Sequence, residues 1–199
     1  MREIYKTEGI ILSNFRAREV DKDFLVLSPD LGLCFMRAGG VRNIKSKLRF
    51  SLQDLSLVDL DLVRGRAGWR ITNAGLKKNW YVGIKGDKIF LQKISEIKNL
   101  LFRMTDGDFE LGKIFELFTE VFDFYEGLGE GVRDKKIRDG LEMVLLSRIL
   151  FGLGYIDGGK WAEGVLEGEK VDIGLIEKVL NNKKFIYEEI NRAINESQL

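Results

Sequence analysis

The clearest pattern of hydrophobic and polar positions lies in the segment LCFMRA, where two kinds of side chain alternate. Cys34, Met36 and Ala38 fall in one phase, and Leu33, Phe35 and Arg37 fall in the other. A period of two is typical of a β-strand with one face toward a core. Because a small barrel has little interior room, we expect the Cys34 phase to point inward. Phe35 and Arg37 are then expected on the outer surface.

Four more segments have β-strand character. They are EGIILSNF at 8–15, FLVLS at 24–28, LSLVDLDLVRG at 55–65 and WRITNAG at 69–75. The apolar phase of the third segment slips between Leu57 and Val58, which predicts a β-bulge. Five short strands with one long glycine-containing connection predict a small Greek-key barrel of the OB type.

The periodicity changes after residue 80. The segment YVGIKGDKIFLQ at 81–92 is expected to be a last extended segment or a linker hairpin around Gly86 and Asp87. Asp108 is expected to cap a helix with an apolar face over 111–122. Further helices are predicted at about 133–153, 172–181 and 183–196.

The expected fold class is therefore α+β with two domains. An N-terminal OB-fold, a five-stranded β-barrel, is predicted at 1–80, and an all-α helical domain at 81–199.

The formal net charge of +1 hides an uneven distribution of charge. Residues 1–80 carry 15 basic and 9 acidic side chains, an excess of six positive charges. Residues 81–199 carry 17 basic and 22 acidic side chains, an excess of five negative charges. Such asymmetry points to a polyanionic partner for the basic half.

The strongest local excess is the stretch RAGGVRNIKSKLRF at 37–50, which has five basic residues and no acidic one. A basic loop on a β-barrel suits a phosphate backbone, whereas a charge run is often only a solvated loop. We expect DNA contact at Arg37, Arg42, Lys45, Lys47 and Arg49.

A second basic cluster surrounds the Gly65–Gly68 turn and could extend the groove, or could simply be a solubilising turn. Its members are Arg64, Arg66 and Arg70. Phe35 and Trp69 are the foremost candidates for base stacking, a contact that accepts any base. Phe15 and Phe24 are weaker candidates, because aromatic residues of a barrel more often belong to its core.

The composition excludes several kinds of site. The chain has no histidine and one cysteine, Cys34, so Cys/His metal sites, Ser-His-Asp triads and an internal disulfide are ruled out. No carboxylate cluster has metal-ligand or acid/base spacing, so no cofactor, metal or enzyme activity is expected. The N-terminal segment is not expected to be a signal peptide, and a reduced cytoplasmic setting is the simple interpretation.

An ordered series of short motifs resembles the RecO family, bacterial DNA repair proteins that act as recombination mediators. The N-terminal motifs are EGIIL at 8–12, EVD at 19–21, SPDLG at 28–32, AGGVR at 38–42, KSKL at 45–48, LQ at 52–53 and LSLVDLDLVRGR at 55–66. LFGLGY at 150–155 is similar to the end of a helix in the family. The resemblance covers about residues 4–76 well and 137–157 weakly.

This resemblance implies an OB-fold followed by a helical domain, binding of single- and double-stranded DNA, and strand annealing. It also implies loading of RecA onto DNA coated by single-strand DNA-binding protein. The implied partners are RecR and the C-terminal tail of that binding protein. Many members carry two Cys-x-x-Cys pairs after the Gly-Tyr motif, which hold a zinc ion, whereas this chain has IDGG at 156–159. Asp54 also stands where the family usually has proline.

A groove among the helix-packing aromatic residues could receive an apolar, acidic peptide tail. The basic residues expected to bind its carboxylates are Arg133, Lys135, Lys136 and Arg138. Two other functions remain open: a generic single-stranded nucleic-acid-binding OB protein, and a structural module that binds protein through its barrel.

Overall fold

The computed structural model describes residues 3–17, 19–43, 45–105, 111–158, 162, 164–166 and 168–197. The chain divides into two compact units. One consists of Met1–Gly83 with Thr105–Phe115, and the other of Ile84–Met104 with Glu116–Leu199.

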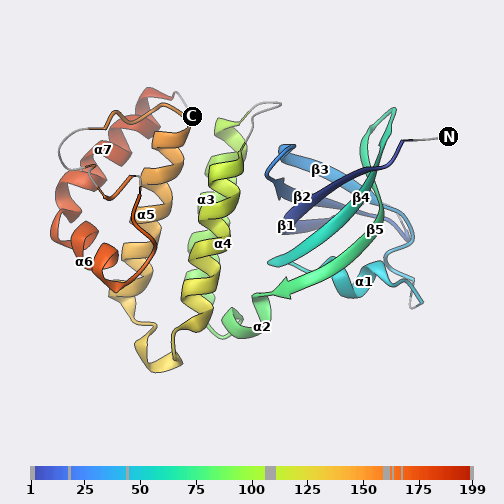
Figure 1. Ribbon diagram of the computed structural model, residues 1–199, viewed down its shortest axis with the longest axis horizontal. Coiled ribbons are helices and arrows are strands. Elements are labelled where there is room, and N and C mark those ends of the chain that lie inside the picture. Colours follow the sequence, from blue (N-terminus) through green and yellow to red (C-terminus); the bar gives the residue numbers. More distant parts are fainter. Residues whose placement is uncertain are drawn as a thin grey trace. The chain divides into compact units, whose positions relative to one another are not determined.

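The first unit is built on a closed five-stranded barrel (Figure 1). Its order around the barrel is β1-β2-β3-β5-β4, with β1 paired to β4 to complete the closure. All neighbouring strands are antiparallel except β3 and β5, which are parallel. This arrangement confirms the predicted OB-type topology. The strands are β1 (Tyr5–Arg16), β2 (Lys22–Ser28), β3 (Gly32–Ala38), β4 (Ser56–Gly65) and β5 (Gly68–Asn79).

The interior of the barrel follows the predicted alternation. Met36 and Ala38 of β3 are fully buried, and Cys34 is partly buried against the same cluster, whereas Phe35 is 48% exposed. Phe24 is fully buried in this core, so it is not available for base stacking.

Register slips bend the strands as closure requires. The predicted bulge between Leu57 and Val58 is confirmed in the β4–β5 pairing. A second slip lies between Asp61 and Leu62 of the same pair, and a third lies between Ile11 and Ser13 of β1. Extra residues at such points increase local twist and curvature.

Two local predictions were wrong. The basic stretch is not wholly loop, because residues Leu48–Ser51 form the short helix α1. The segment 81–92 is neither extended nor a hairpin: it forms α2 (Tyr81–Ile84) and the start of α3 (Lys88–Met104). Asp87 starts α3, because its Oδ1 accepts the backbone N–H of Phe90 at 3.0 Å.

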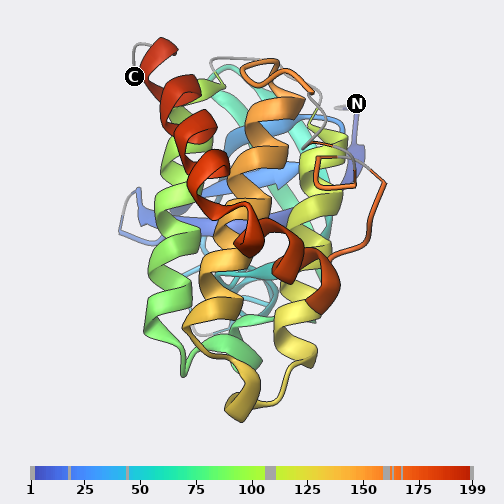
Figure 2. The ribbon, with the colours of Figure 1, turned by 90° about the vertical axis from the view of Figure 1, so that its left-hand side faces the viewer.

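The second unit is helical, as predicted. α5 is its centre and packs against α3, α6 and α7 (Figure 2). Asp134 caps the start of α5 by accepting the backbone N–H of Ile137, and Gly154 follows its end with a φ of 80°. The predicted cap Asp108 lies outside the described residues. The remaining elements are α4 (Gly112–Gly127), the 3₁₀ turn η1 (Glu130–Val132), α5 (Lys135–Gly152), α6 (Ile173–Asn181) and α7 (Lys183–Glu196).

Among the described residues, no helix is both long enough and apolar enough to cross a lipid bilayer.

Candidate nucleic-acid interface

Three cationic side chains line one pocket of about 310 Å³ on the barrel. Lys22 is the first residue of β2, Arg42 lies in the turn after β3, and Arg49 lies in α1. The other lining residues are Val41 and Leu52, which are 3% and 4% exposed and belong to the barrel core. We call this site, formed by these five residues, the cationic pocket.

Neutral oxygen atoms hold two of the three cations. Nη1 of Arg42 donates to the backbone carbonyl of Glu19 at 2.7 Å, and Nζ of Lys22 donates to Oδ1 of Asn14 at 2.7 Å. The amide of Asn14 in turn donates to Oδ1 of Asp54 at 2.7 Å. Lys22, Arg42 and Arg49 form no ion pair with a carboxylate in the part of the chain that the structure describes. Their charge therefore remains available to an incoming anion.

The remaining lysines of the basic stretch are also exposed. Lys45 and Lys47 lie between β3 and α1, beside Arg49. The turns around them are ordered by backbone hydrogen bonds, such as that from Asn43 to the carbonyl of Gly40 at 3.1 Å. Gly40 has a φ of 67°, a conformation that glycine adopts without strain. These lysines thus extend the cationic surface beyond the pocket.

Arg37 forms an ion pair with a carboxylate. Its Nε and Nη2 donate to the two carboxylate oxygens of Asp23 at 2.7 and 2.9 Å. Those hydrogen bonds raise the pKa of Arg37 above its usual value. The strand register pairs Asp23 of β2 with Arg37 of β3, which explains how an acidic partner can be 14 residues away in sequence. Arg37 is therefore largely neutralised, unlike Arg42.

The predicted hairpin cluster carries exposed cations around an aromatic ring. The guanidinium of Arg64 lies 4.9 Å from the ring centre of Trp69, and Tyr5 packs 5.5 Å from the same ring. Arg66 lies exposed at the tip, and Arg70 is exposed beside β3. Trp69 is half-buried and packs against the barrel core, so little of its face is open to a base.

Strand register brings Arg37 and Arg70 together and places Lys22 on the neighbouring strand β2. Arg37 of β3 pairs with Arg70 of β5, and Lys22 of β2 pairs with Ala38 of β3. Lys22, Arg37 and Arg70 therefore come from three adjacent strands. The Nη2 atom of Arg70 lies only 2.8 Å from where a Cβ of Gly39 would stand, so a larger residue there would displace it.

Phe35 forms an exposed aromatic pair with Phe15. The rings meet edge to face with centroids 5.8 Å apart, and the two residues are 48% and 46% exposed. Base stacking requires an accessible aromatic ring, so Phe35 stays a candidate for it.

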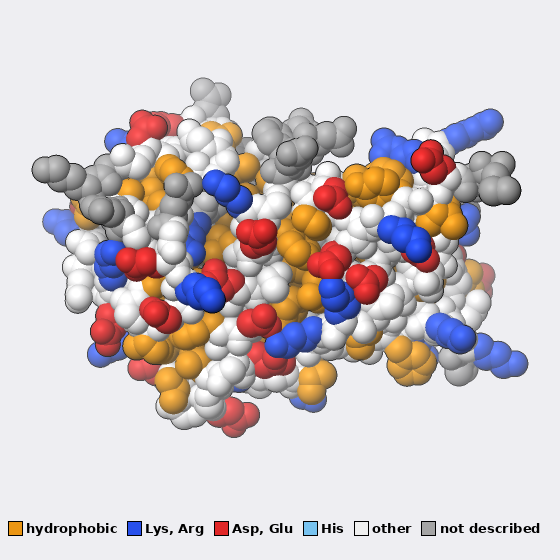
Figure 3. All heavy atoms as spheres, viewed as in Figure 1, with side chains coloured by type: hydrophobic (Ala, Val, Ile, Leu, Met, Phe, Trp, Pro, Cys, Tyr) orange, Lys and Arg blue, Asp and Glu red, His pale blue; other side chains and the backbone are white. Residues whose placement is uncertain are grey.

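A second pocket of the barrel has the opposite charge. Its volume is about 510 Å³, and four of its lining residues are acidic against one lysine. The acidic members are Glu8, Asp30, Asp59 and Asp61, and the lysine is Lys6. This larger pocket would repel a phosphate backbone, so the cationic surface is local rather than general. Acidic and basic side chains are likewise interspersed on the face drawn in Figure 3.

The basic residues predicted to bind a peptide tail are mostly engaged inside the helical unit. Nη1 of Arg138 forms an ion pair with Asp87 at 2.8 Å, and Lys135 pairs with Asp139. Arg133 donates to two backbone carbonyls and lies 5.1 Å from the ring of Tyr125. Lys136 is exposed, and the side chain of Lys135 is 79% exposed despite its ion pair, so the peptide site stays a prediction.

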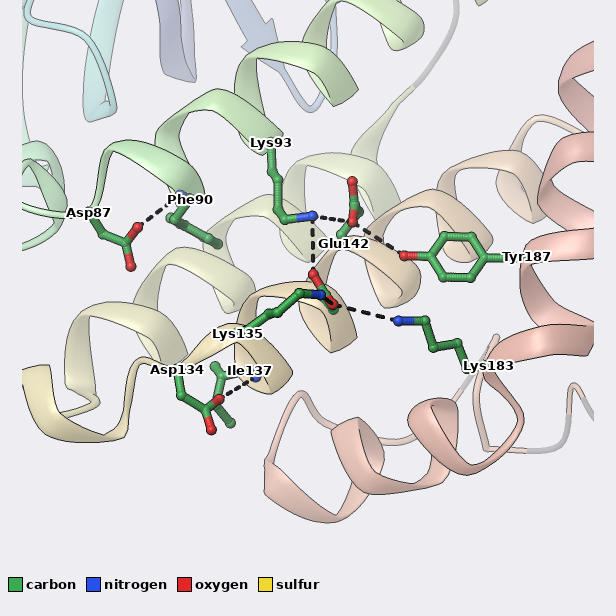
Figure 4. Close-up of polar contacts among 10 residues, drawn as sticks. Asp87, Phe90, Lys93, Asp134, Lys135, Ile137, Glu142, Lys183 and Tyr187 are labelled. Atoms are coloured by element: carbon green, nitrogen blue, oxygen red, sulfur yellow. Dashed lines mark hydrogen bonds and ion pairs between the residues drawn. The ribbon is translucent and has the colours of Figure 1, made fainter.

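The contact of Lys135 with Asp139 belongs to a polar network between α5 and its neighbouring helices (Figure 4). Asp139 is met by Lys93 of α3 at 3.3 Å and by Lys183 of α7 at 3.6 Å, as well as by Lys135. Burial alone would raise the pKa of Asp139, but the hydrogen bonds from Lys135 and Lys93 outweigh it and hold the pKa below its usual value. The network links α3, α5 and α7 through ion pairs, so its role is to stabilise the helical unit.

Two findings concern metal binding and the one cysteine of the chain. No three acidic or cysteine side chains come close enough to hold a metal ion within the described ranges. Cys34 lies partly buried against the barrel core, as expected of a small packing residue.

Lys22 is the functional candidate that the sequence did not reveal. It lies between Asp21 and Asp23 in the sequence, so the local net charge around it is negative and does not indicate a cationic site. Only the pairing of β2 with β3 brings it beside the residues that follow β3.

Comparison with known proteins agrees with the architecture. No protein-family model matches the chain. DNA repair protein RecO of Rubrobacter xylanophilus is 27% identical over 169 residues, covering 83% of this chain and 65% of that protein. DNA repair protein RecO of Dehalococcoides mccartyi is 39% identical over 70 residues, covering 35% of this chain and 28% of that protein. The chain thus spans less than two thirds of the length of either relative. The two matches, the ordered motifs and the barrel followed by helices together show that the chain is similar to proteins of the RecO family.

Proposed function

We propose that this protein acts in DNA repair by binding DNA through the cationic surface of its barrel. The observation that carries the proposal is the convergence of Lys22, Arg42 and Arg49 on one pocket, where no carboxylate of the described residues pairs with them. The names of both relatives, DNA repair protein RecO, agree with this role.

The binding is electrostatic and independent of base sequence. Each phosphate that Arg or Lys neutralises releases condensed counterions, and this release drives association at low salt. Lys45 and Lys47 provide further phosphate contacts beside the pocket, and Arg64, Arg66 and Arg70 extend the path around the hairpin. Arg37 contributes less, because Asp23 already holds it.

Stacking on Phe35 supports a preference for unpaired bases. Its ring and that of Phe15 are exposed and belong to the same barrel as the cations. Bases held against an aromatic face contribute about 1–3 kcal/mol each, whatever their identity. Screening of two strands by one cationic surface would then permit complementary strands to pair, which is the annealing step of a recombination mediator.

The partner proteins are also proposals. The partners implied by the resemblance to the RecO family are RecR, the acidic C-terminal tail of single-strand DNA-binding protein and, indirectly, RecA. Lys135 and Lys136 are the exposed cations of the predicted tail site, although Lys135 also pairs with Asp139, whereas Arg138 is held by Asp87. In this role the protein binds and positions DNA and does not catalyse a reaction.

Charge reversal tests the proposal. The triple variant R42E/K45E/K47E should lose binding to a labelled single-stranded oligonucleotide at low salt, with little change in the thermal melt. The matched control is K85E/K88E/K184E, which changes net charge equally at three exposed residues outside the barrel. Binding by the first variant as tight as that of the control would refute the proposal. Annealing of complementary strands, followed in the same samples, separates a mediator from a generic single-strand binder.

A further inference from the structure

We propose that the cationic pocket binds the terminal phosphate of a DNA strand. The inference rests on the proposed DNA binding and goes further, because it assigns one kind of phosphate to one site. An internal phosphodiester carries one negative charge, whereas a terminal phosphomonoester carries about two near neutral pH and three strong acceptor oxygens.

The shape of the site favours an end over a continuous backbone. The three cations come from separate elements and meet around Val41 and Leu52, two residues of the barrel core. The volume of about 310 Å³ lies at the lower limit of typical small-ligand pockets, a size that suits a compact terminal group. An internal phosphate is linked to two sugars, and both would have to stay outside the pocket. A terminal phosphate is linked to one sugar, so it can enter the pocket from the end of a strand.

The charge of the pocket fits the same ligand. Three cations face a ligand of about two negative charges, and the acceptors that hold Arg42 and Lys22 are neutral. No carboxylate of the described residues therefore has to be displaced from them when the phosphate arrives. Arg37 shows the contrary arrangement, because a phosphate there would compete with both oxygens of Asp23.

The test compares one oligonucleotide sequence with different ends. Binding of the full-length chain is measured for a 5′-phosphorylated, a 3′-phosphorylated and an unphosphorylated strand, and for a circular single strand of the same base composition. We expect a phosphorylated end to bind about tenfold more tightly than a hydroxyl end, the effect of one or two charge-assisted hydrogen bonds in a partly exposed site. The salt dependence should steepen by about 0.7 per additional neutralised charge.

Single substitutions locate the effect. R49Q should reduce the ratio between phosphorylated and unphosphorylated strands to about one, and K22Q should do the same. K47Q removes one positive charge outside the pocket lining and should leave the ratio near tenfold. R49Q is informative even if another variant fails to fold, because Arg49 is exposed on α1.

Three results would overturn the inference. The first is an equal affinity for all strand ends and for the circle. The second is an end preference that R49Q and K22Q do not change. The third is competition by free thymidine monophosphate at the concentration at which the phosphorylated strand competes, which would make the pocket a small-anion site. In each of these cases salt-dependent DNA binding still stands, whereas a chain that binds none of the strands refutes the proposed function itself.

Discussion

Removing the carboxylate of Asp23 should increase the affinity for DNA. The substitution D23N keeps the shape of the side chain but ends the two-point ion pair with Arg37. Arg37 is on the outer side of β3 and pairs in register with Arg70 of β5. Once released, its guanidinium can contact a phosphate beside the residues already proposed to do so.

The structure sets the size of both effects. The two side chains are 42% and 28% exposed, so the pair contributes about 0.2–1 kcal/mol to stability and the melting temperature should change little. One new phosphate contact should steepen the logarithmic salt dependence of single-strand binding by about 0.7. The dissociation constant at low salt should fall about threefold to fivefold, the ratio that corresponds to about 0.7–1 kcal/mol.

Fluorescence anisotropy with a labelled single strand measures both quantities. D59N is the matched control, since it removes the same charge from the acidic side of the barrel. The double variant D23N/R37Q should bind less tightly than D23N, because the gain depends on the guanidinium. If D23N gains no more than D59N, or keeps its gain without Arg37, the assignment of this surface to DNA is wrong.

Three further predictions concern the helical unit and are measured by chemical denaturation. G140A should lower the free energy of unfolding by about 1–3 kcal/mol, because its Cβ would stand 2.6 Å from Cγ2 of Ile176; unchanged stability would contradict this packing of α5 on α6. R148M should lower the free energy of unfolding by about 2–3 kcal/mol, since the mostly buried guanidinium donates at 2.7 Å to two backbone carbonyls between α5 and α6; an unchanged free energy would show that water replaces it. The lowered pKa of Asp139 means that its charge stabilises the fold above the unfolded value of about 3.9 and that this stability is lost as pH falls through the folded value. The difference in the free energy of unfolding between the native chain and D139N should therefore be largest at pH 6–8 and should disappear below about pH 4. A difference independent of pH would refute the lowered pKa of Asp139.

Much of the barrel could be predicted from local pattern. The alternation around Met36 reports burial directly, since successive side chains of a strand point to opposite faces. The slip after Leu57 is likewise visible in the sequence, because a bulge shifts the apolar phase by one residue. The two helices within 81–92 were missed because Gly86 and Asp87 have turn chemistry; they do form the turn between α2 and α3, and the carboxylate of Asp87 caps α3.

The candidate site was only partly predictable, for reasons of register. Arg42 and Arg49 stand in an obvious basic stretch, and the structure places both in the cationic pocket. The pairing of β2 with β3 places Lys22 in the cationic pocket and sets Asp23 beside Arg37. Contacts between strands depend on alignment across the sheet, which charge counts along the chain do not contain.

The salt dependence of single-strand binding tests the central claim most directly. The association constant of the unmodified chain for a labelled oligonucleotide is measured between 50 and 200 mM salt. If at least the three cations of the pocket neutralise phosphates, the slope of log K against log salt should be about −2 or steeper. A slope near zero, or no binding at 50 mM salt, would contradict the account.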